Sequence, residues 1–352
     1  MAPYVVLVFA PYLLALIMKR STYEENKLGR RMTVVAFFFL FFLLLAFRAN
    51  TCGTDLLAYE RFFSNARFNE WKQTFAWDGE LGYFYLQKLV HLISENFYVF
   101  SAIVAFLSLI PWCVFCARET DNAVLTVAIF VAVAPFSMFF SGLRQILAMA
   151  MAVPIWYCVK NKKWLLLILS LALACSFHKS AWMMIAIIPL YYINITKKWL
   201  FGLVPAGILV LIFNKPLFDF LVKLIGESDK TAMDVGGYAV LILLTIFVVY
   251  AFFLTDEEKM DRDTIALRNI LVLSVFLQCF APIHTLAMRM NYYFLPFVSV
   301  LIPRVTHRAR FSLEKVGDIA TIIMVVFFTF WFIQNLASGG SLNIYPYKSW
   351  LF

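Results

Sequence analysis

Apolar segments of roughly 15 to 21 residues recur along the whole chain and are separated by shorter polar stretches. These lengths approach the ~20 residues that a helix needs to cross the hydrocarbon core of a bilayer. We therefore expect an all-α polytopic membrane protein with about twelve transmembrane helices. In chain order the expected spans are residues 3–18, 32–47, 97–117, 123–140, 143–159, 163–177, 179–194, 199–213, 237–254, 266–281, 287–303 and 316–336.

Some segments of this pattern have special assignments. Segments 163–177 and 179–194 flank a Ser-Phe-His-Lys-Ser break, so a re-entrant pair is an alternative to two spans. Segment 216–225 is short and apolar, and we expect it to lie in the membrane interface. Residues 48–96 form a large polar loop in which amphipathic helices are expected. No linker or shift in composition marks a second domain, so 1–352 is predicted to be one helical domain.

Composition agrees with the hydropathy pattern. The chain is 63% hydrophobic and 14% charged, whereas soluble proteins carry about 25% charged residues. Its 38 Phe, 16 Tyr and 9 Trp are more apolar surface than one water-soluble core of this size could hide. Soluble enzymes, secreted disulfide scaffolds and disordered tails are excluded.

Basic residues predict how the chain is oriented in the membrane. Of the 30 Lys and Arg, 18 fall in alternate loops, at about three times the density found in the other set. The positive-inside rule places the dense set in the cytoplasm, so both termini are predicted to be extracytoplasmic. The net charge of +9 is assigned to topology and not to nucleic-acid binding. Because the first Lys is Lys19, no cleavable signal peptide is expected.

The sequence predicts no metal site and no cofactor. Of the six cysteines, Cys52 alone falls in a clearly polar loop, so no disulfide is expected. Cys113 and Cys116 share a helix face but have no His or acidic neighbours to complete a metal site. Neither a Walker sequence nor a GxGxxG motif after a strand is present, which argues against ATP-driven transport.

Four polar residues lie at helix ends on the predicted outer side: Arg48, Arg144, His178 and Arg289. Arg144 lies near the first turn of a helix, where free N–H groups and the helix dipole favour an anion. Its planar guanidinium pairs two phosphate oxygens at once. An Arg at this depth is costly unless it is paired or lines a wet cavity. The pattern predicts a cavity that opens outward and suits the pyrophosphate of a lipid carrier.

Two of these four residues have simpler explanations that stay open. The Arg48 guanidinium could snorkel to a lipid phosphate. His178 could be a capped, solvated residue at a helix junction.

Several short motifs occur in the order found in a known family. They are Arg48-x4-Gly53-Thr54-Asp55-x3-Tyr59, Glu80-x-Gly82-Tyr83, Arg144-Gln145-x2-Ala148, Phe177-His178-Lys179-Ser180, Arg289-x2-Tyr292 and Tyr345-Pro346-Tyr347-Lys348. On these motifs the chain resembles the EpsG-like branch of Wzy-type polysaccharide polymerases, including O-antigen and exopolysaccharide polymerases. One departure is Leu56, where the family often has an aromatic residue, and this puts local packing in doubt.

The resemblance implies a GT-C-type membrane glycosyltransferase that needs no metal and acts on the outer face of the bacterial plasma (inner) membrane. Such enzymes join undecaprenyl-diphosphate-linked oligosaccharide repeat units. The growing glycan passes from its lipid diphosphate to a sugar hydroxyl of the incoming unit. The implied partners are these lipid-linked sugars and membrane lipids, with a chain-length regulator protein as a further candidate and no nucleic acid.

The resemblance also implies roles for individual residues. Arg144 and Arg289 are the candidates for stabilising the diphosphate leaving group. His178 is the candidate base, because imidazole changes charge near neutral pH, and Asp55 is the alternative. The expected substrate-binding residues are Arg48, Asp55, Tyr59, Gln145, Tyr292, Tyr347 and Lys348. The three tyrosines either stack on sugar faces or lie in the aromatic belt.

Three other functions compete with this one. A flippase of lipid-linked sugars needs functional charges at mid-bilayer depth and on the inner half, whereas the candidates here cluster on one side. A second alternative is another outer-face transferase. A ligase would differ from the polymerase in its acceptor, and an enzyme using a monophosphate-linked sugar would differ in its donor. The sequence specifies neither. A membrane acyltransferase places its key His and Arg within reach of a cytoplasmic donor, and His178 is predicted to lie outside.

Overall fold

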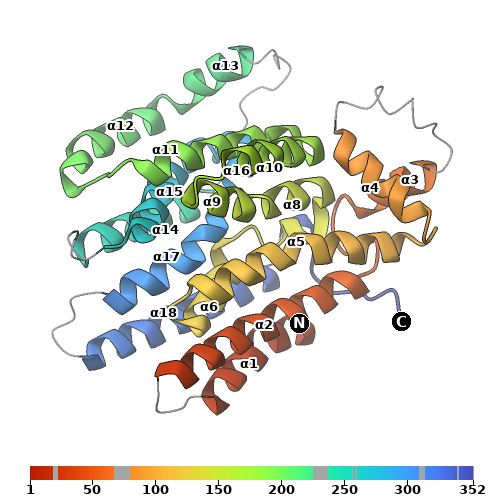
Figure 1. Ribbon diagram of the computed structural model, residues 1–352, viewed down its shortest axis with the longest axis horizontal. Helices are drawn as coiled ribbons and strands as arrows, with labels where there is room; N and C mark the ends of the chain where they lie inside the picture. The colour runs from red at the N-terminus through yellow and green to blue at the C-terminus, as the bar shows by residue number, and fades with distance from the viewer. Residues whose placement is uncertain are drawn as a thin grey trace.

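The computed structural model describes residues 1–18, 23–66, 80–224, 237–255, 257, 260–308, 314–338 and 341–351. These residues form α-helices, short 3-10 helices labelled η, and connecting loops (Figure 1). Residues 67–79 of the predicted outer loop lie outside the described residues. The helices are α1 (Ala2–Ile17), α2 (Tyr23–Phe47), α3 (Leu56–Ala66), α4 (Leu81–His91), α5 (Phe97–Glu119), α6 (Ala123–Val133), α7 (Met138–Ser141), α8 (Leu143–Ala150), α9 (Ala152–Lys160), α10 (Trp164–Phe177), η2 (Lys179–Ala186), α11 (Ile187–Tyr192), η3 (Lys197–Trp199), α12 (Leu200–Ile212), α13 (Asn214–Leu224), α14 (Tyr238–Phe253), α15 (Arg262–Gln278), α16 (Thr285–Asn291), α17 (Leu295–Arg308), α18 (Glu314–Ala337) and η5 (Ser341–Asn343).

The all-helical prediction is confirmed for the described residues, and the apolar character of the helices is that of a membrane protein. Three helices in this part of the chain are long and apolar enough to cross a bilayer: Lys27–Phe47, Phe97–Glu119 and Val316–Ala337. The number rises to 5 when each of two bent helix pairs is counted as one span. Most of the other expected spans are shorter or interrupted helices, so the figure of about twelve spans stays a prediction.

Several expected spans are interrupted for identifiable reasons. The expected span 123–140 ends as a helix at Val133, and α7 begins only at Met138. Pro135 lies in this gap, where it has no N–H to donate and disfavours the helical conformation of Ala134. The expected span 179–194 begins as the 3-10 helix η2 and becomes α-helical only in α11.

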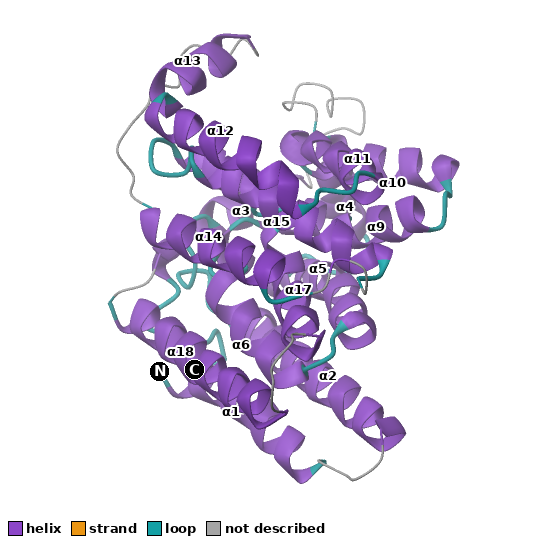
Figure 2. Cartoon of the chain, turned by 90° about the vertical axis from the view of Figure 1, so that its left-hand side faces the viewer, coloured by secondary structure: helices purple, strands orange, loops and turns teal. Residues whose placement is uncertain are grey.

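The helices lie side by side, with different structures at the two ends of the molecule. Figure 1 places α3 and α4 at one end and the last turn of α17 and the first turns of α2 and α18 at the other. Helices α12 and α13 lie at the margin of the molecule and are bent by 79° relative to each other (Figure 2). No residue of α12 is fully buried, so much of its apolar surface faces outward.

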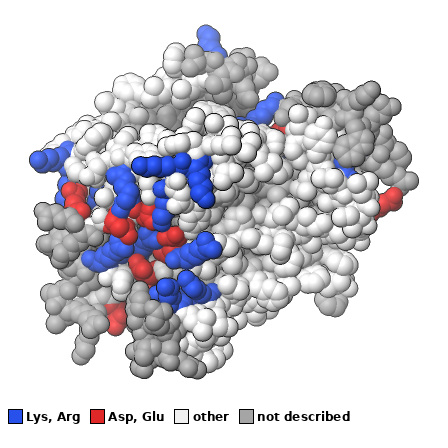
Figure 3. All heavy atoms as spheres, in the orientation of Figure 1, with Lys and Arg blue, Asp and Glu red and all other residues white. Residues whose placement is uncertain are grey.

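Charged side chains gather on the visible face at the end opposite α3 and α4, over the ends of α14, α15 and α17 (Figure 3). Many of these charges are paired. Lys160 pairs with Asp263, Arg304 with Glu119 and Arg308 with Asp261. This is the end that the sequence assigned to the cytoplasm, and that assignment and the placement of the termini stay predictions.

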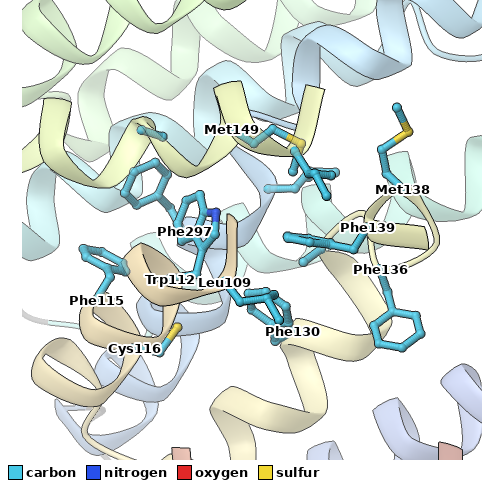
Figure 4. Close-up of a cluster of buried hydrophobic side chains, with 14 of the residues drawn as sticks. Leu109, Trp112, Phe115, Cys116, Phe130, Phe136, Met138, Phe139, Met149 and Phe297 are labelled. Carbon is cyan, nitrogen blue, oxygen red and sulfur yellow. The ribbon is translucent and has the colours of Figure 1, made fainter. Parts of the chain in front are cut away.

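The core between α5, α6, α8 and α17 is strongly aromatic (Figure 4). Trp112 and Phe115 of α5 pack edge-on against Phe297 of α17, with ring centroids 5.2 and 5.1 Å apart. Edge-to-face contacts of this kind add to the gain from burying the rings. This packing supports α8, whose first turn carries Arg144.

Candidate functional site

Glu80 contacts the other polar residues at the centre of the site. It directly precedes α4 and is 7% exposed. Its Oε2 accepts a hydrogen bond from Arg144 Nη1 at 2.5 Å, and its Oε1 lies 2.6 Å from His178 Nδ1. The Lys179 backbone N–H also donates to Oε1, at 3.3 Å. One carboxylate therefore joins the N-terminal ends of α4, α8 and η2.

Arg144 has a second partner from another element. Its Nε donates to the Tyr59 hydroxyl at 3.4 Å, and its guanidinium carbon lies 5.8 Å from the centre of the Tyr59 ring. Tyr59 belongs to α3, so this contact attaches α3 to the site. The Arg144 side chain nevertheless keeps 31% of its surface exposed, which leaves it access to a ligand.

Glu80 is held ionised by its neighbours. Burial alone would raise the pKa of Glu80, but its hydrogen bond to His178, the charge of Arg144 and the Lys179 N–H outweigh this and lower the pKa below its ordinary value of 4.5. An ionised carboxylate accepts a hydrogen from Nδ1 of the imidazole, which assigns the proton of a neutral His178 to that nitrogen. The other ring nitrogen, Nε2, is then free to accept a proton.

Two further contacts bring Arg289 into the same region. Gln145 Nε2 donates to the Arg289 carbonyl oxygen at 2.8 Å. The hydroxyls of Ser180 and Tyr293 are 2.8 Å apart, which joins η2 to the chain just after α16. Within the described residues no carboxylate pairs with the partly exposed Arg289 side chain, so this cation remains available to an anion.

Glycines in the sequence motifs allow these elements to approach. A Cβ at Gly82 would lie 2.2 Å from Ser176 Oγ, so glycine is what lets α4 lie against α10 and brings Glu80 to His178. Gly53 has a φ of +133° and a Cβ there would lie 2.3 Å from the Phe140 carbonyl oxygen. This close approach places α3 beside the start of α8.

Asp55 and Tyr292 lie near the site but are not bound to Glu80. The Asp55 backbone N–H donates to Ser141 Oγ at 3.0 Å, and its partly exposed side chain lies one helical turn before Tyr59. Tyr292 lines a cavity of about 370 Å³ together with Gln278 and residues 131–137. Asp55 as a base and Tyr292 as a sugar platform stay predictions.

Arg48 occupies a different environment from the one expected. It is 1% exposed, and its guanidinium donates to the Phe139 carbonyl at 3.2 Å and to Ser101 Oγ at 3.1 Å. These partners fix the end of α2 against α5 and the α7 segment. The geometry therefore gives Arg48 a structural place and no open face toward a phosphate.

Tyr347 and Lys348 belong to a segment that we call the C-terminal strap, residues 344–350, which lies along residues 44–49. The Tyr347 hydroxyl donates to the Leu44 carbonyl at 3.0 Å, and the Lys348 carbonyl accepts from the Ala49 N–H at 2.8 Å. Neither Tyr347 nor Lys348 is among the hydrogen-bond partners of Glu80 in the described part of the chain. Substrate binding by Tyr347 gains no support from this position, although the Lys348 side chain is exposed.

Glu80 belongs to one of the sequence motifs, but the pattern of residues predicted no role for it at the site. The available signal was an acidic residue among motifs whose other charged members, apart from Asp55, are Arg, His and Lys, since buried cations need a counter-charge. In the described part of the chain no group of three or more His, Cys, Asp and Glu is arranged to hold a metal ion. Metal independence stays a prediction.

Comparison of the sequence with known families places this site in context. The family model described as EpsG family matches residues 31–349, a range that includes every residue of the site. The chain belongs to the EpsG family. This confirms the resemblance that the motifs indicated, and EpsG membership assigns the protein to polysaccharide biosynthesis, in a role like that of a polymerase. Searches of curated proteins and of solved structures found no match, so the likeness to GT-C enzymes remains a sequence-based prediction.

Proposed function

We propose that this EpsG protein polymerises polyprenyl-diphosphate-linked oligosaccharide repeat units on the outer face of the plasma membrane. The growing glycan would be transferred from its lipid diphosphate to a sugar hydroxyl of the incoming unit. The observation that carries the proposal is that Glu80 holds Arg144 and His178 on its two oxygens, an arrangement that suits a cation for the leaving group and a base for the acceptor.

The first requirement of this reaction is stabilisation of the diphosphate. Breaking the anomeric C–O bond leaves the electron pair on a phosphate oxygen, and fixed cations aimed at that oxygen lower the barrier. Arg144 and Arg289 are assigned this role. Glu80 neutralises only part of the positive charge of Arg144, Arg289 and Lys179, so the site keeps a surplus that attracts an anion.

The second requirement is an acceptor oxygen that has lost its proton. Nε2 of His178 takes the hydroxyl proton while that oxygen forms its bond to the anomeric carbon, and the bond from this carbon to the diphosphate breaks. Glu80 holds the ring through Nδ1 and stabilises the imidazolium that results. Glu80 is thus a positioning residue, and Asp55 stays the alternative base.

The test is the banding pattern of the polysaccharide, a ladder of chain lengths, from a deletion strain. The strain is complemented with wild type, Arg144→Ala, Arg144→Lys or His178→Ala at matched protein levels. We expect Arg144→Ala to reduce chain extension by about 10²–10³, so that the polymer ladder collapses to one capped repeat unit. Arg144→Lys should restore part of the ladder, because lysine supplies charge without the two-oxygen fork. Arg61→Ala, an exposed arginine of α3, is the matched control and should keep the full ladder.

Two outcomes would contradict the proposal. A full ladder from Arg144→Ala would remove the diphosphate role from this residue. Loss of even the single surface unit in the deletion strain, with lipid-linked units trapped inside the cell, would identify a flippase instead.

A further inference from the structure

An apolar groove of about 280 Å³ lies between η2, α13, the end of α15 and α16. Among the described residues its lining carries no charged side chain, and it includes Trp182, Phe218, Leu221, Ala287 and Met290. Trp182 is 53% exposed and Leu221 46% exposed, so the groove is bordered by the outward-facing apolar surface of the protein. It therefore opens sideways, in the direction from which a lipid would enter.

Two walls of this groove continue directly into the site. Trp182 and Met183 belong to η2, which begins at Lys179 directly after His178. The Lys179 N–H donates to Glu80. On α16, Ala287 and Met290 line the groove on either side of Arg289. A molecule with a hydrocarbon chain in the groove thus has its head beside the cations of the site.

We propose that this groove holds the isoprenoid chain of the polyprenyl diphosphate while its diphosphate lies at Arg144 and Arg289. This inference rests on the proposed function and adds where its lipid is bound. In a bilayer the surrounding acyl chains are as apolar as the groove, so hydrophobic burial alone does not select one lipid over another. The selection comes from the diphosphate head, and the groove orients the lipid relative to the reacting bond.

A second groove of the chain supplies a matched control. It measures about 260 Å³, is also almost wholly apolar, and lies between α12, α14 and α15. None of its lining residues belongs to η2 or α16, so it has no continuity with the cationic site. We expect it to take membrane lipids without regard to their head group.

The experiment uses the full-length protein in lipid nanodiscs and two photoreactive probes with a diazirine in the first isoprene units. One probe is a polyprenyl diphosphate and the other is the corresponding polyprenol. We expect the diphosphate to label the peptides of Trp182, Leu221 and Met290 about tenfold more than the alcohol, a ratio equivalent to ~1.4 kcal/mol. Excess undecaprenyl diphosphate should suppress this labelling, and Arg144→Ala should reduce it to the level of the alcohol.

Two substitutions separate the two grooves. Ala287→Phe fills the proposed groove and should reduce diphosphate-probe labelling and chain extension about tenfold. Gly207→Leu fills the control groove, where the nearest atom to an added Cβ is Phe276 Cζ at 4.0 Å, and should change neither. Leu221→Trp narrows the proposed groove from the exposed α13 helix and replaces Ala287→Phe if that variant unfolds early.

The outcomes distinguish failure of the groove from failure of the function. Equal labelling of this groove by both probes, or labelling and extension that persist in Ala287→Phe and in Leu221→Trp, would overturn the groove assignment while leaving polymerisation intact. If undecaprenyl diphosphate suppresses labelling nowhere in the chain, the proposed function fails, and the inference fails with it.

Discussion

At the scale of the residue, Glu80 is one carboxylate that serves two cationic partners. Its Oε2 binds Arg144 and its Oε1 faces His178, so removing the carboxylate would leave both partners without a counter-charge among the described residues. A partly buried charge that loses its partner is costly, and its side chain turns to another partner or to water. The positions of Arg144 and His178 therefore depend on the charge of Glu80 as well as on its shape.

Glu80→Gln tests this dependence because the amide keeps the shape and removes the charge. We expect kcat for chain extension to fall by about 10²–10⁴, since His178 loses the group that fixes its protonated nitrogen. The measurement is extension of lipid-linked repeat units by purified protein. Glu60→Gln, on the neighbouring α3, should retain normal rates. Normal kcat in Glu80→Gln would show that the carboxylate positions nothing.

The same variant has a second readout in the pH dependence of stability. The folded-state pKa of Glu80 is lowered, so its ionised form stabilises the protein at pH values above the ordinary pKa of 4.5. This stabilisation is lost as the pH falls through the lower folded-state pKa. The unfolding temperature of the wild type should therefore fall more steeply below pH 4.5 than that of Glu80→Gln. Parallel curves would contradict the assignment.

Individual site residues were predicted unevenly from the sequence. Arg144, His178 and Arg289 were predicted as site residues because an Arg or His at a helix end is unusual in an apolar chain. The structure brings their helices together, and their roles stay predictions. Arg48 followed the same rule, yet its guanidinium turns inward to Phe139 and Ser101. A sequence gives the depth of a side chain along a helix but not the direction in which it leaves that helix.

At the scale of the element, the packing of α4 against α10 decides whether the site exists. Gly82 is the point of approach, and Ser176 lies only two residues before His178. A side chain at position 82 would push against both the hydroxyl and the backbone of Ser176. The separation of the two helices therefore determines how closely Glu80 approaches His178.

Gly82→Ala should thus weaken the contact between Glu80 and His178, as loss of Glu80 would, without removing a charge. We expect extension to fall at least about tenfold, because ångström-scale misplacement of catalytic groups costs as much as 10² in rate. Gly202→Ala in α12 is the control, since nothing lies within 4 Å of its added Cβ. The double variant Gly82→Ala/Ser176→Gly should recover part of the rate. Full activity in Gly82→Ala alone would show that the helices have room to separate.

Hydropathy predicted long continuous helices better than interrupted ones. The expected segments 97–117 and 316–336 correspond to α5 and α18, which are long and apolar enough to span a membrane. The break after Val133 was missed because the apolar run continues through Ala134, Pro135 and Phe136. Apolarity is equal on both sides of that break, so only the backbone chemistry of proline marks it.

At the scale of the whole molecule, the C-terminal strap joins the two ends of the described chain. The Trp350 ring stacks on Tyr98 with centroids 4.9 Å apart, and its Nε1 donates to the Ala46 carbonyl at 3.0 Å. The Tyr4 hydroxyl donates to the Ile344 carbonyl, so α1 is held by the same segment. The strap therefore fixes α1, α2 and α5 to one another near Arg48.

Trp350→Ala measures what the strap contributes to stability. Loss of an aromatic stack and one hydrogen bond should lower the free energy of unfolding by about 1–2.5 kcal/mol. Unfolding in detergent, followed by tryptophan fluorescence or calorimetry, gives the value. Trp199→Ala, which removes a 51% exposed ring, should change it by less than about 0.5 kcal/mol. If Trp350→Ala lowered the free energy of unfolding as little as Trp199→Ala does, the Trp350 contacts of the strap would add no stability.

The strap also sets an order of events during synthesis. Tyr347 and Leu44 meet although they are 303 positions apart, so Leu44 leaves the ribosome long before its partner exists. Ser101 and Phe139, the hydrogen-bond partners of the Arg48 guanidinium, follow it by only 53 and 91 positions, so they are made long before the strap. Insertion of the early helices and docking of the strap on them are consequently separate steps in time. The contacts between α2 and the strap thus form only after translation has delivered residues 344–350.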